Sequence, residues 1–232
     1  MPPTSPIFYD SPSALADALR AFLAPPAPAT CPGEVRRTKP EAGPPLAVVG
    51  IGNALRGDDA FGPAVVAALE PCPALRLFDV QAVPESFLVP IVSSGCAGVL
   101  FVDAADLGAE PGRVALVPAE HLAEVDVSTH AISLALVAEA IQCLARESSH
   151  VPSKPGDERS RLRLSVLSKP GDERSLPAGA GESPGRRSSR DLPCALLGAQ
   201  PADLTTADRL SPAMQSAVRL AAAALRAFAS AV

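Results

Sequence analysis

The 232-residue sequence contains 26 prolines and 16 glycines, with one tyrosine and no tryptophan. Eleven prolines lie in residues 1–45 and six in residues 147–193, so the other 140 residues form a body of ordinary proline content, with a net charge of −7 and no lysine. This acidic, aromatic-poor body argues against a nucleic-acid-binding protein, and the lack of an apolar run of about 18 residues argues against a membrane-spanning one.

The amino terminus and the cysteines both favour a cytoplasmic protein. Met1–Pro6 carries no positively charged side chain, and Asp17 and Arg20 interrupt the apolar stretch Ala14–Ala24, so we expect no secretory signal peptide. The five cysteines are an odd number without CxxC spacing. This pattern is typical of small buried side chains in a reducing compartment, and it argues against a disulfide framework or a zinc knuckle.

Residues 1–45 have the composition of a Pro/Ala-rich N-terminal extension. The amphipathic spacing of Ser13–Leu23 predicts a short helix, which ends at Ala24–Pro28 because proline cannot continue a helix. The remainder, up to Pro45, is typical of a linker. We therefore expect residues 1–45 to be mostly disordered and a single folded domain to span residues 46–232.

From residue 46 onward, short apolar segments alternate with segments of helical periodicity. The apolar segments are continuous, which is typical of strands that are buried on both faces. The pattern predicts an α/β fold, a three-layer sandwich with a mostly parallel, twisted sheet of about five strands flanked by helices on both faces. The predicted strands are Leu46–Ile51, Leu75–Val80, Gly98–Val102, Gly112–Val117 and Cys194–Leu197, and the predicted helices are Asp59–Leu69, Pro84–Ser93, His130–Arg146 and Ser211–Ala229.

A repeated octapeptide interrupts this alternation. The sequence SKPGDERS occurs at Ser153–Ser160 and again at Ser168–Ser175, within a 147–193 segment that is rich in Ser, Arg, Pro and Gly. Two copies are too few for a repeat fold, and neither copy has an apolar face to bury. The segment is therefore predicted to be a disordered insertion in a surface loop of the domain.

Polar side chains follow three of the predicted strands. Asp59 comes after the first strand, Asp103 directly after the third, and His130 at the start of the helix that follows the fourth. Ligands of open α/β sheets bind beyond the carboxyl ends of the strands, and two carboxylates with an imidazole suit a divalent ion such as nickel or zinc. Each residue also has an ordinary structural explanation, as a helix cap or an Asx turn, and Asp58 is equally available as an N-cap.

Two other kinds of site fit the residues less well. Gly50 and Gly52 follow a strand, but the third glycine of a dinucleotide-binding motif is replaced by Leu55, and Asp58 and Asp59 would repel a pyrophosphate at the helix start. The sequence has no GxSxG nucleophile motif. Adjacent helical residues point about 100° apart, so Asp58 and Asp59 would not form an acid dyad.

Four segments carry the motifs of a known family: GIGNALRGDDAFG at 50–62, DAADLGAEPG at 103–112, STHAISL at 128–134 and LLGAQPADL at 196–204. Together with Val83-Pro84-Glu85 before the second helix of the body, they cover nearly all of the body. In these segments the sequence resembles the hydrogenase maturation endopeptidases, which trim the C-terminal tail of a nickel-containing hydrogenase large subunit. The similarity is greatest to the branch that serves formate-hydrogenlyase-type hydrogenases.

The resemblance implies an aspartyl-type endopeptidase with a metal site made by Asp59, Asp103 and His130. Nickel, already inserted in the large-subunit precursor, would be the recognition element, and another divalent ion could replace it in vitro. Either a metal-polarised water attacks with Asp59 or Asp103 as the base, or the ion only docks the substrate and a carboxylate works unaided. Asp58 and Asn53 would then orient the site, with a helix cap as the alternative role of Asp58. The expected protein is a monomer, with the hydrogenase precursor as its partner.

The sequence also departs from the family. Relatives have a glycine pair after the aspartate of the second strand, where this chain has Val80 and Gln81 after Asp79. Two side chains at this place would narrow the cleft. Residues 1–45 and 147–193 have no counterpart in the family, and an insertion over the cleft would block the substrate. The alternative function is therefore a non-catalytic or degenerate relative that binds the metal or the precursor as an accessory module.

Overall fold

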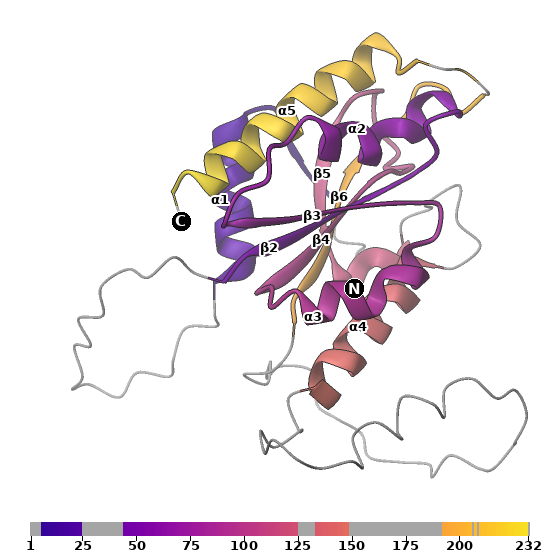
Figure 1. The fold of residues 1–232 in the computed structure, drawn as a ribbon. Coiled ribbons are helices and arrows are strands. Elements are labelled where there is room, and N and C mark those ends of the chain that lie inside the picture. Colours follow the sequence, from indigo (N-terminus) through magenta and orange to yellow (C-terminus); the bar gives the residue numbers. More distant parts are fainter. Residues whose placement is uncertain are drawn as a thin grey trace, which may run out of the picture.

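The computed structural model describes residues 6–24, 44–124, 133–148, 192–205, 207 and 209–231. These residues form one six-stranded sheet in the order β1-β5-β6-β4-β2-β3, with helices on both faces (Figure 1). The five predicted strands are confirmed, and a short sixth strand, β1, was not predicted. The strands are β1 (Ile7–Tyr9), β2 (Leu46–Ile51), β3 (Leu75–Gln81), β4 (Gly98–Ala104), β5 (Val114–Pro118) and β6 (Cys194–Ala199).

The sheet is mostly parallel, as predicted. Strands β3, β2, β4 and β6 are paired in parallel, β5 is antiparallel to β6, and the edge strand β1 is antiparallel to β5. Every residue of β2, β4 and β6 is buried, which explains why these three strands are continuously apolar apart from Asp103 of β4. The α-helices are α1 (Pro12–Leu23), α2 (Phe61–Ala67), α3 (Leu88–Ser93), α4 (Leu134–Ser148) and α5 (Pro212–Ala229), and the 3₁₀ helices are η1 (Gly57–Ala60), η2 (Pro84–Phe87) and η3 (Ala119–Glu124).

Two hydrophobic cores lie on the two faces of the sheet. Along β4, Leu100 and Val102 point into the core beneath α1, α2 and α5, whereas Val99 and Phe101 point into the core beneath α3 and α4. This alternation follows from the period of two in a strand. The three-layer sandwich predicted from the sequence is therefore confirmed.

Residues 6–24 contribute more to the fold than the sequence suggested. The helix predicted at residues 13–23 is confirmed as α1, which packs along α5 and buries Leu15 and Leu19 completely. Strand β1 pairs with β5, with Tyr9 opposite Val114. Residues 6–24 thus belong to the domain, because α1 packs on α5 and β1 pairs with β5. The predictions for the linker that follows, and for both copies of the octapeptide repeat, concern segments outside the described residues.

Two predicted helices begin with a 3₁₀ turn. The helix expected at Asp59–Leu69 is η1 followed by α2, and the one expected at Pro84–Ser93 is η2 followed by α3.

Among the helices of the described residues, none combines the length and the hydrophobicity that a membrane span requires.

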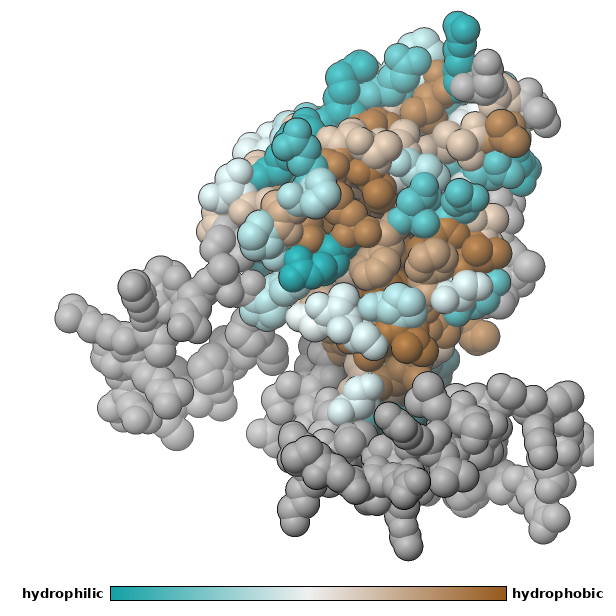
Figure 2. Space-filling view, in the orientation of Figure 1, coloured by the Kyte–Doolittle hydropathy of each residue, from teal (hydrophilic) through white to brown (hydrophobic). Residues whose placement is uncertain are grey.

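Strand β3 is the edge of the sheet opposite β1. It pairs only with β2 among the strands of the described residues, and its Leu77 and Phe78 are half-buried. On the face seen in Figure 2, hydrophobic residues gather across the middle of the molecule, where Figure 1 shows β3, and hydrophilic residues surround them.

Candidate functional site

The carboxyl ends of β2 and β4 lie side by side. The two strands are parallel neighbours, and Gly50 of β2 is paired with Val102 of β4. The residues that follow each strand therefore emerge at the same edge of the sheet. A Cβ atom on Gly62 would collide with the carbonyl oxygens of both Ile51 and Val102. The start of α2 therefore rests directly on the two strand ends, and only glycine allows this approach.

Asp59 lies in η1, above the end of β2, and is 1% exposed. The backbone N–H of Asn53 donates a hydrogen bond to Asp59 Oδ2 at 3.0 Å, and Asn53 Oδ1 accepts one from the Leu55 amide at 2.9 Å. A Cβ on Gly52 would collide with the Asp59 carbonyl oxygen, so the loop after β2 folds tightly around this aspartate. Asn53 thus orients Asp59 through its main chain.

Asp103 is the second buried carboxylate at this edge. It is fully buried near the end of β4, level with Gly198 of the neighbouring β6. Asp59 comes after β2 and Asp103 lies near the end of the neighbouring β4, so both carboxylates stand at the same edge of the sheet. The carboxylate oxygens of this pair suit a divalent cation.

The third predicted metal ligand, His130, lies outside the described residues, so its place in the site stays a prediction. Within the described ranges, no group of three or more His, Cys, Asp or Glu side chains is placed to hold a metal ion. The structure therefore brings Asp59 and Asp103 to one edge of the sheet and leaves the complete ligand set untested.

Asp58 is not a helix cap, so the N-cap role that the sequence suggested for it is wrong. The cap positions of η1 and α2 are occupied by Arg56 and Ala60. The Asp58 carboxylate instead accepts three backbone hydrogen bonds, one to Oδ1 and two to Oδ2, at 2.7–3.1 Å. The donors are the amides of Ser211, Ala202 and Asp203.

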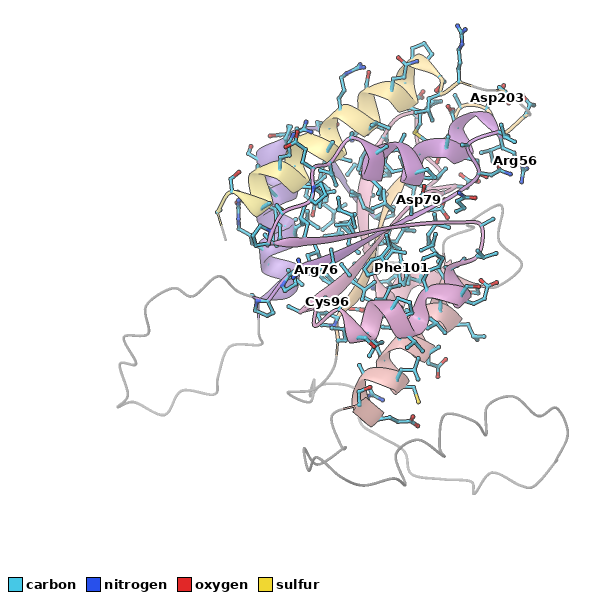
Figure 3. The ribbon with its side chains drawn as sticks, viewed as in Figure 1. Arg56, Arg76, Asp79, Cys96, Phe101 and Asp203 are labelled. Carbon is cyan, nitrogen blue, oxygen red and sulfur yellow. The ribbon has the colours of Figure 1, made fainter. Side chains whose placement is uncertain are left out.

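These hydrogen bonds fasten the loop between β6 and α5 onto η1. The Asp58 amide donates in turn to the Asp203 carbonyl, and the Gly57 amide donates to the Ala207 carbonyl. Arg56 and Asp203 lie in the same region of the molecule in Figure 3. Both hydrogen bonds from Thr205, through its backbone N–H and its hydroxyl, lower the pKa of the exposed Asp203 carboxyl. Asp58 therefore holds a loop beside the candidate site.

Gln200 is a site-edge residue that sequence reasoning missed. Its side-chain Oε1 accepts hydrogen bonds from the backbone amides of Leu107 at 2.7 Å and Ala109 at 3.2 Å. Gln200 follows β6, so it ties the loop after β4 to the end of β6. The only feature of the sequence that could have pointed to Gln200 is its place in the LLGAQPADL motif.

Gln81, at the end of β3, has a left-handed backbone with φ of 50°. This conformation costs about 1–3 kcal/mol for a residue other than glycine. Glycine would adopt this conformation without that cost. Only one of the two extra side chains reaches the surface, because Val80 is 1% exposed and packs in the core whereas Gln81 is exposed.

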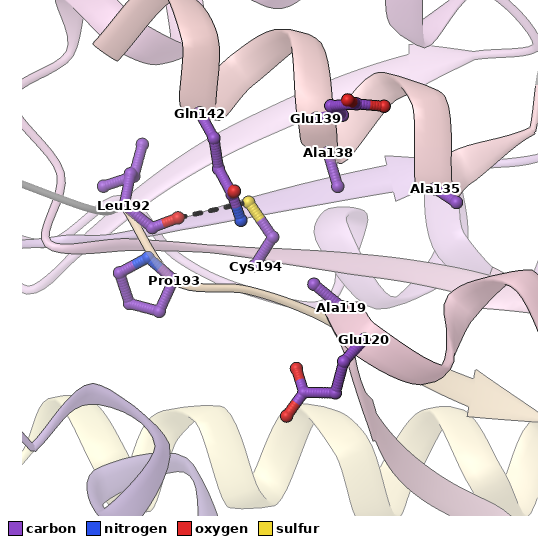
Figure 4. Close-up of a pocket in the computed structure, with 9 residues that line it drawn as sticks. All are labelled: Ala119, Glu120, Ala135, Ala138, Glu139, Gln142, Leu192, Pro193 and Cys194. Atoms are coloured by element: carbon purple, nitrogen blue, oxygen red, sulfur yellow. Dashed lines mark hydrogen bonds between the residues drawn. The ribbon is translucent and has the colours of Figure 1, made fainter. Parts of the chain in front are cut away.

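A cavity of about 330 Å³ lies elsewhere, between α4, η3 and the start of β6 (Figure 4). Cys194 lines it and is level with Val99, whereas Asp103 is level with Gly198, so the cavity and the carboxylates lie at opposite ends of β6. Burial raises the pKa of the Cys194 thiol to about 12. Cys96 makes a smaller contribution in the same direction, and a hydrogen bond with Gln142 opposes them by lowering the pKa. Cys194 is thus an unreactive buried thiol, as the sequence predicted, and the cavity is separate from the candidate site.

Nine solved chains match this one, and three of them are described here. A [NiFe] hydrogenase maturation protease, HycI from Thermococcus kodakarensis KOD1, is 24% identical with a TM-score of 0.54, covering 81% of this chain and 94% of that one. The endopeptidase HycI from Escherichia coli is 19% identical with a TM-score of 0.51, covering 75% and 85%. An endopeptidase from Escherichia coli is 19% identical with a TM-score of 0.50, covering 79% and 93%.

No protein-family model matches the sequence, and no curated protein matches it. The similarity is therefore one of structure, and it extends over almost the whole length of the solved chains. The chain has the fold of the hydrogenase maturation proteases, as the resemblance of its motifs implied.

Proposed function

We propose that the protein is an endopeptidase that removes the C-terminal tail of a nickel-containing hydrogenase large-subunit precursor. The observation that carries this proposal is the fold shared with a [NiFe] hydrogenase maturation protease over 94% of that chain, with Asp59 and Asp103 buried at one edge of the sheet. We further propose that it acts as a monomer in the cytoplasm, where the precursor would be processed.

In this proposal the nickel belongs to the substrate. Asp59, Asp103 and His130 bind the nickel that the precursor carries, and this contact places the scissile bond at the carboxyl edge of β2 and β4. The donor set supports the assignment, since carboxylate oxygens and an imidazole nitrogen suit a borderline divalent ion.

The carboxylates perform the proton transfers. A water molecule attacks the carbonyl carbon of the scissile peptide bond, Asp59 or Asp103 accepts its proton, and the same proton is delivered to the amine as the C–N bond breaks. The hydrogen bond from the Asn53 amide holds Asp59 in one orientation for this work. The nickel of the precursor supplies Lewis-acid polarisation if it contacts the carbonyl oxygen.

Cys194 is not suited to act as a nucleophile in this mechanism. The thiolate is the reactive form of cysteine, and the raised pKa of about 12 keeps Cys194 protonated near neutral pH. Cys194 also lies at the far end of β6 from Asp103. Neither position nor ionisation therefore suits Cys194 to attack a peptide bond at the proposed site.

The test compares matched variants on a purified, nickel-loaded large-subunit precursor. Asp59→Asn and Asp103→Asn are each expected to reduce the rate of tail removal at least about 100-fold, because each removes a charge that binds nickel or accepts a proton. Glu70→Gln, which changes an exposed acid after α2, is the control and should process at the wild-type rate. Mass spectrometry of the precursor gives the rates.

Circular dichroism of each variant separates loss of activity from loss of fold. Wild-type processing by a folded Asp59→Asn or Asp103→Asn would remove that residue from the proposed site. A wild-type protein that binds the precursor and never shortens it would instead identify an accessory module.

A further inference from the structure

Gln81 is the one non-glycine residue with a positive φ in the described part of the chain. In this left-handed conformation the Cβ atom crowds the following carbonyl oxygen, so glycine is favoured there and glutamine is not. Backbone strain of this kind persists where it serves function. Gln81 therefore needs an explanation from its place in the molecule.

Packing does not supply that explanation. The side chain of Gln81 is exposed, and its neighbour Val80 makes the core contact at the end of β3. Within the described residues, the side-chain amide of Gln81 makes no hydrogen bond, although the Gln81 backbone N–H donates to Asp79 Oδ1 at 3.3 Å. The fold would hold the turn equally well with glycine at this position.

Gln81 is joined to the candidate site through the main chain. Its carbonyl oxygen accepts a hydrogen bond from the Gly52 amide at 2.9 Å, and the next amide, that of Asn53, donates to Asp59 Oδ2 at 3.0 Å. Gly52 is itself packed against the Asp59 main chain. The Gln81 side chain thus stands at the rim of the edge that holds the buried carboxylates.

Exposed apolar side chains belong to the same rim. Leu55, in the loop after β2, is 69% exposed, and Val83, in the loop after β3, is 46% exposed. Both loops leave the carboxyl ends of neighbouring parallel strands, so they flank the same edge. A polar amide and two exposed apolar side chains at the same edge suit a ligand with both kinds of group.

A carboxamide is the hydrogen-bonding complement of a peptide unit, because it offers one carbonyl acceptor and two N–H donors. We propose that Gln81 is a substrate-binding residue that hydrogen-bonds the main chain of an extended peptide at the candidate site, with Leu55 and Val83 contacting side chains of that peptide. The identity of the peptide as the C-terminal tail of the precursor rests on the proposed function.

The test uses three variants at this position. Gln81→Gly relieves the strain and removes the amide, Gln81→Glu keeps the size and removes both N–H donors, and Gln81→Asn keeps an amide in a residue that tolerates a positive φ. Gln215→Ala, at an exposed glutamine of α5, is the matched control. The measurements are steady-state kinetics on nickel-loaded precursor, and anisotropy of a labelled synthetic peptide with the sequence of the precursor tail.

We expect Gln81→Gly and Gln81→Glu to raise KM about fivefold to tenfold, as for the loss of one or two hydrogen bonds, with kcat within about twofold of wild type. Gln81→Asn should fall between them and the wild type, and Gln215→Ala should match the wild type. The melting temperature of Gln81→Gly should be no lower than that of the wild type, because the variant removes strain.

The outcomes separate this inference from the proposed function. Cleavage by the wild type with an unchanged KM in both Gln81→Gly and Gln81→Glu would overturn the role of Gln81 and leave the protease assignment intact. Absence of cleavage, with weaker binding of the tail peptide by Gln81→Gly than by the wild type, would support Gln81 and contradict the protease. Absence of both cleavage and any binding difference would contradict both.

Discussion

Asp58 and Asp59 are adjacent in the sequence and almost equally buried, yet the structure gives them different surroundings. Asp58 faces the loop between β6 and α5 and accepts three of its backbone amides, whereas Asp59 faces the loop after β2. The difference follows from the helical turn of η1, in which neighbouring side chains point in different directions. We therefore expect substitutions of Asp58 to affect stability and substitutions of Asp59 to affect the proposed function.

Asp58→Asn tests the structural half of this statement. Asparagine would turn an N–H₂ group toward at least one backbone amide and leave donors unsatisfied, so we expect the free energy of unfolding to fall by about 2–3 kcal/mol. Urea denaturation of the variant and of the exposed-acid control Glu70→Gln measures the loss. An unchanged midpoint in Asp58→Asn would show that these amides do not depend on the carboxylate.

Cys194 offers a residue-scale test of burial. Because its pKa is raised to about 12 in the folded state, the folded protein holds the thiol proton more tightly than the unfolded chain does. The stability that depends on this group is complete below pH 9.0, the ordinary value, and is lost as the pH rises from there toward about 12. Iodoacetamide at pH 8 should modify the exposed Cys143 and leave Cys194 unmodified in the native protein.

Peptide mapping by mass spectrometry measures the extent of modification of Cys143 and Cys194 in the same sample. The urea-unfolded protein is the control, in which the two thiols should react alike. Rapid modification of native Cys194 would contradict the burial of the start of β6.

The sequence could place Asp59 and Asp103 at the carboxyl ends of apolar strands, because a polar residue that follows an apolar segment is a local feature. It could not predict the partners of Asp58, which lie 144 to 153 residues further along the chain. The same holds for Gln200, whose partners lie 91 and 93 residues away. The left-handed backbone of Gln81 was also beyond prediction, because its own side chain disfavours it.

At the scale of elements, α1 and α5 show how local and tertiary information differ. Both helices were predicted from their amphipathic spacing and confirmed. Their contact was not predicted, because the proline-rich composition of the first 45 residues suggested a detached extension. The burial of Leu15 and Leu19 beneath α5 instead makes α1 part of the core.

Leu19→Ala measures that contribution. Leu19 is fully buried, so the substitution removes apolar contacts and leaves a cavity, and we expect a loss of about 2–5 kcal/mol in the free energy of unfolding. Ala21→Ser, on the exposed face of α1, is the control and should change stability by less than about 0.5 kcal/mol. Equal denaturation midpoints for the two variants would place α1 outside the cooperative unit.

For the whole molecule, the alternation of apolar and helical segments was enough to predict a mostly parallel, doubly covered sheet. The addition of β1 at the antiparallel edge escaped prediction, because three residues are too short a segment for a periodic signal. The order of the strands brings the ends of β2 and β4 together, and this neighbour relation turns two separate aspartates into one candidate site. The same arrangement of elements recurs in a [NiFe] hydrogenase maturation protease.

The most direct measurement is mass spectrometry of a purified hydrogenase large-subunit precursor after incubation with the wild-type protein, with nickel-loaded and nickel-free precursor compared in parallel. We expect the nickel-loaded precursor to lose its C-terminal tail as one released peptide, and the nickel-free precursor to keep its full mass. An intact nickel-loaded precursor after incubation with folded protein would contradict the protease assignment, and equal cleavage of both forms would contradict recognition through nickel.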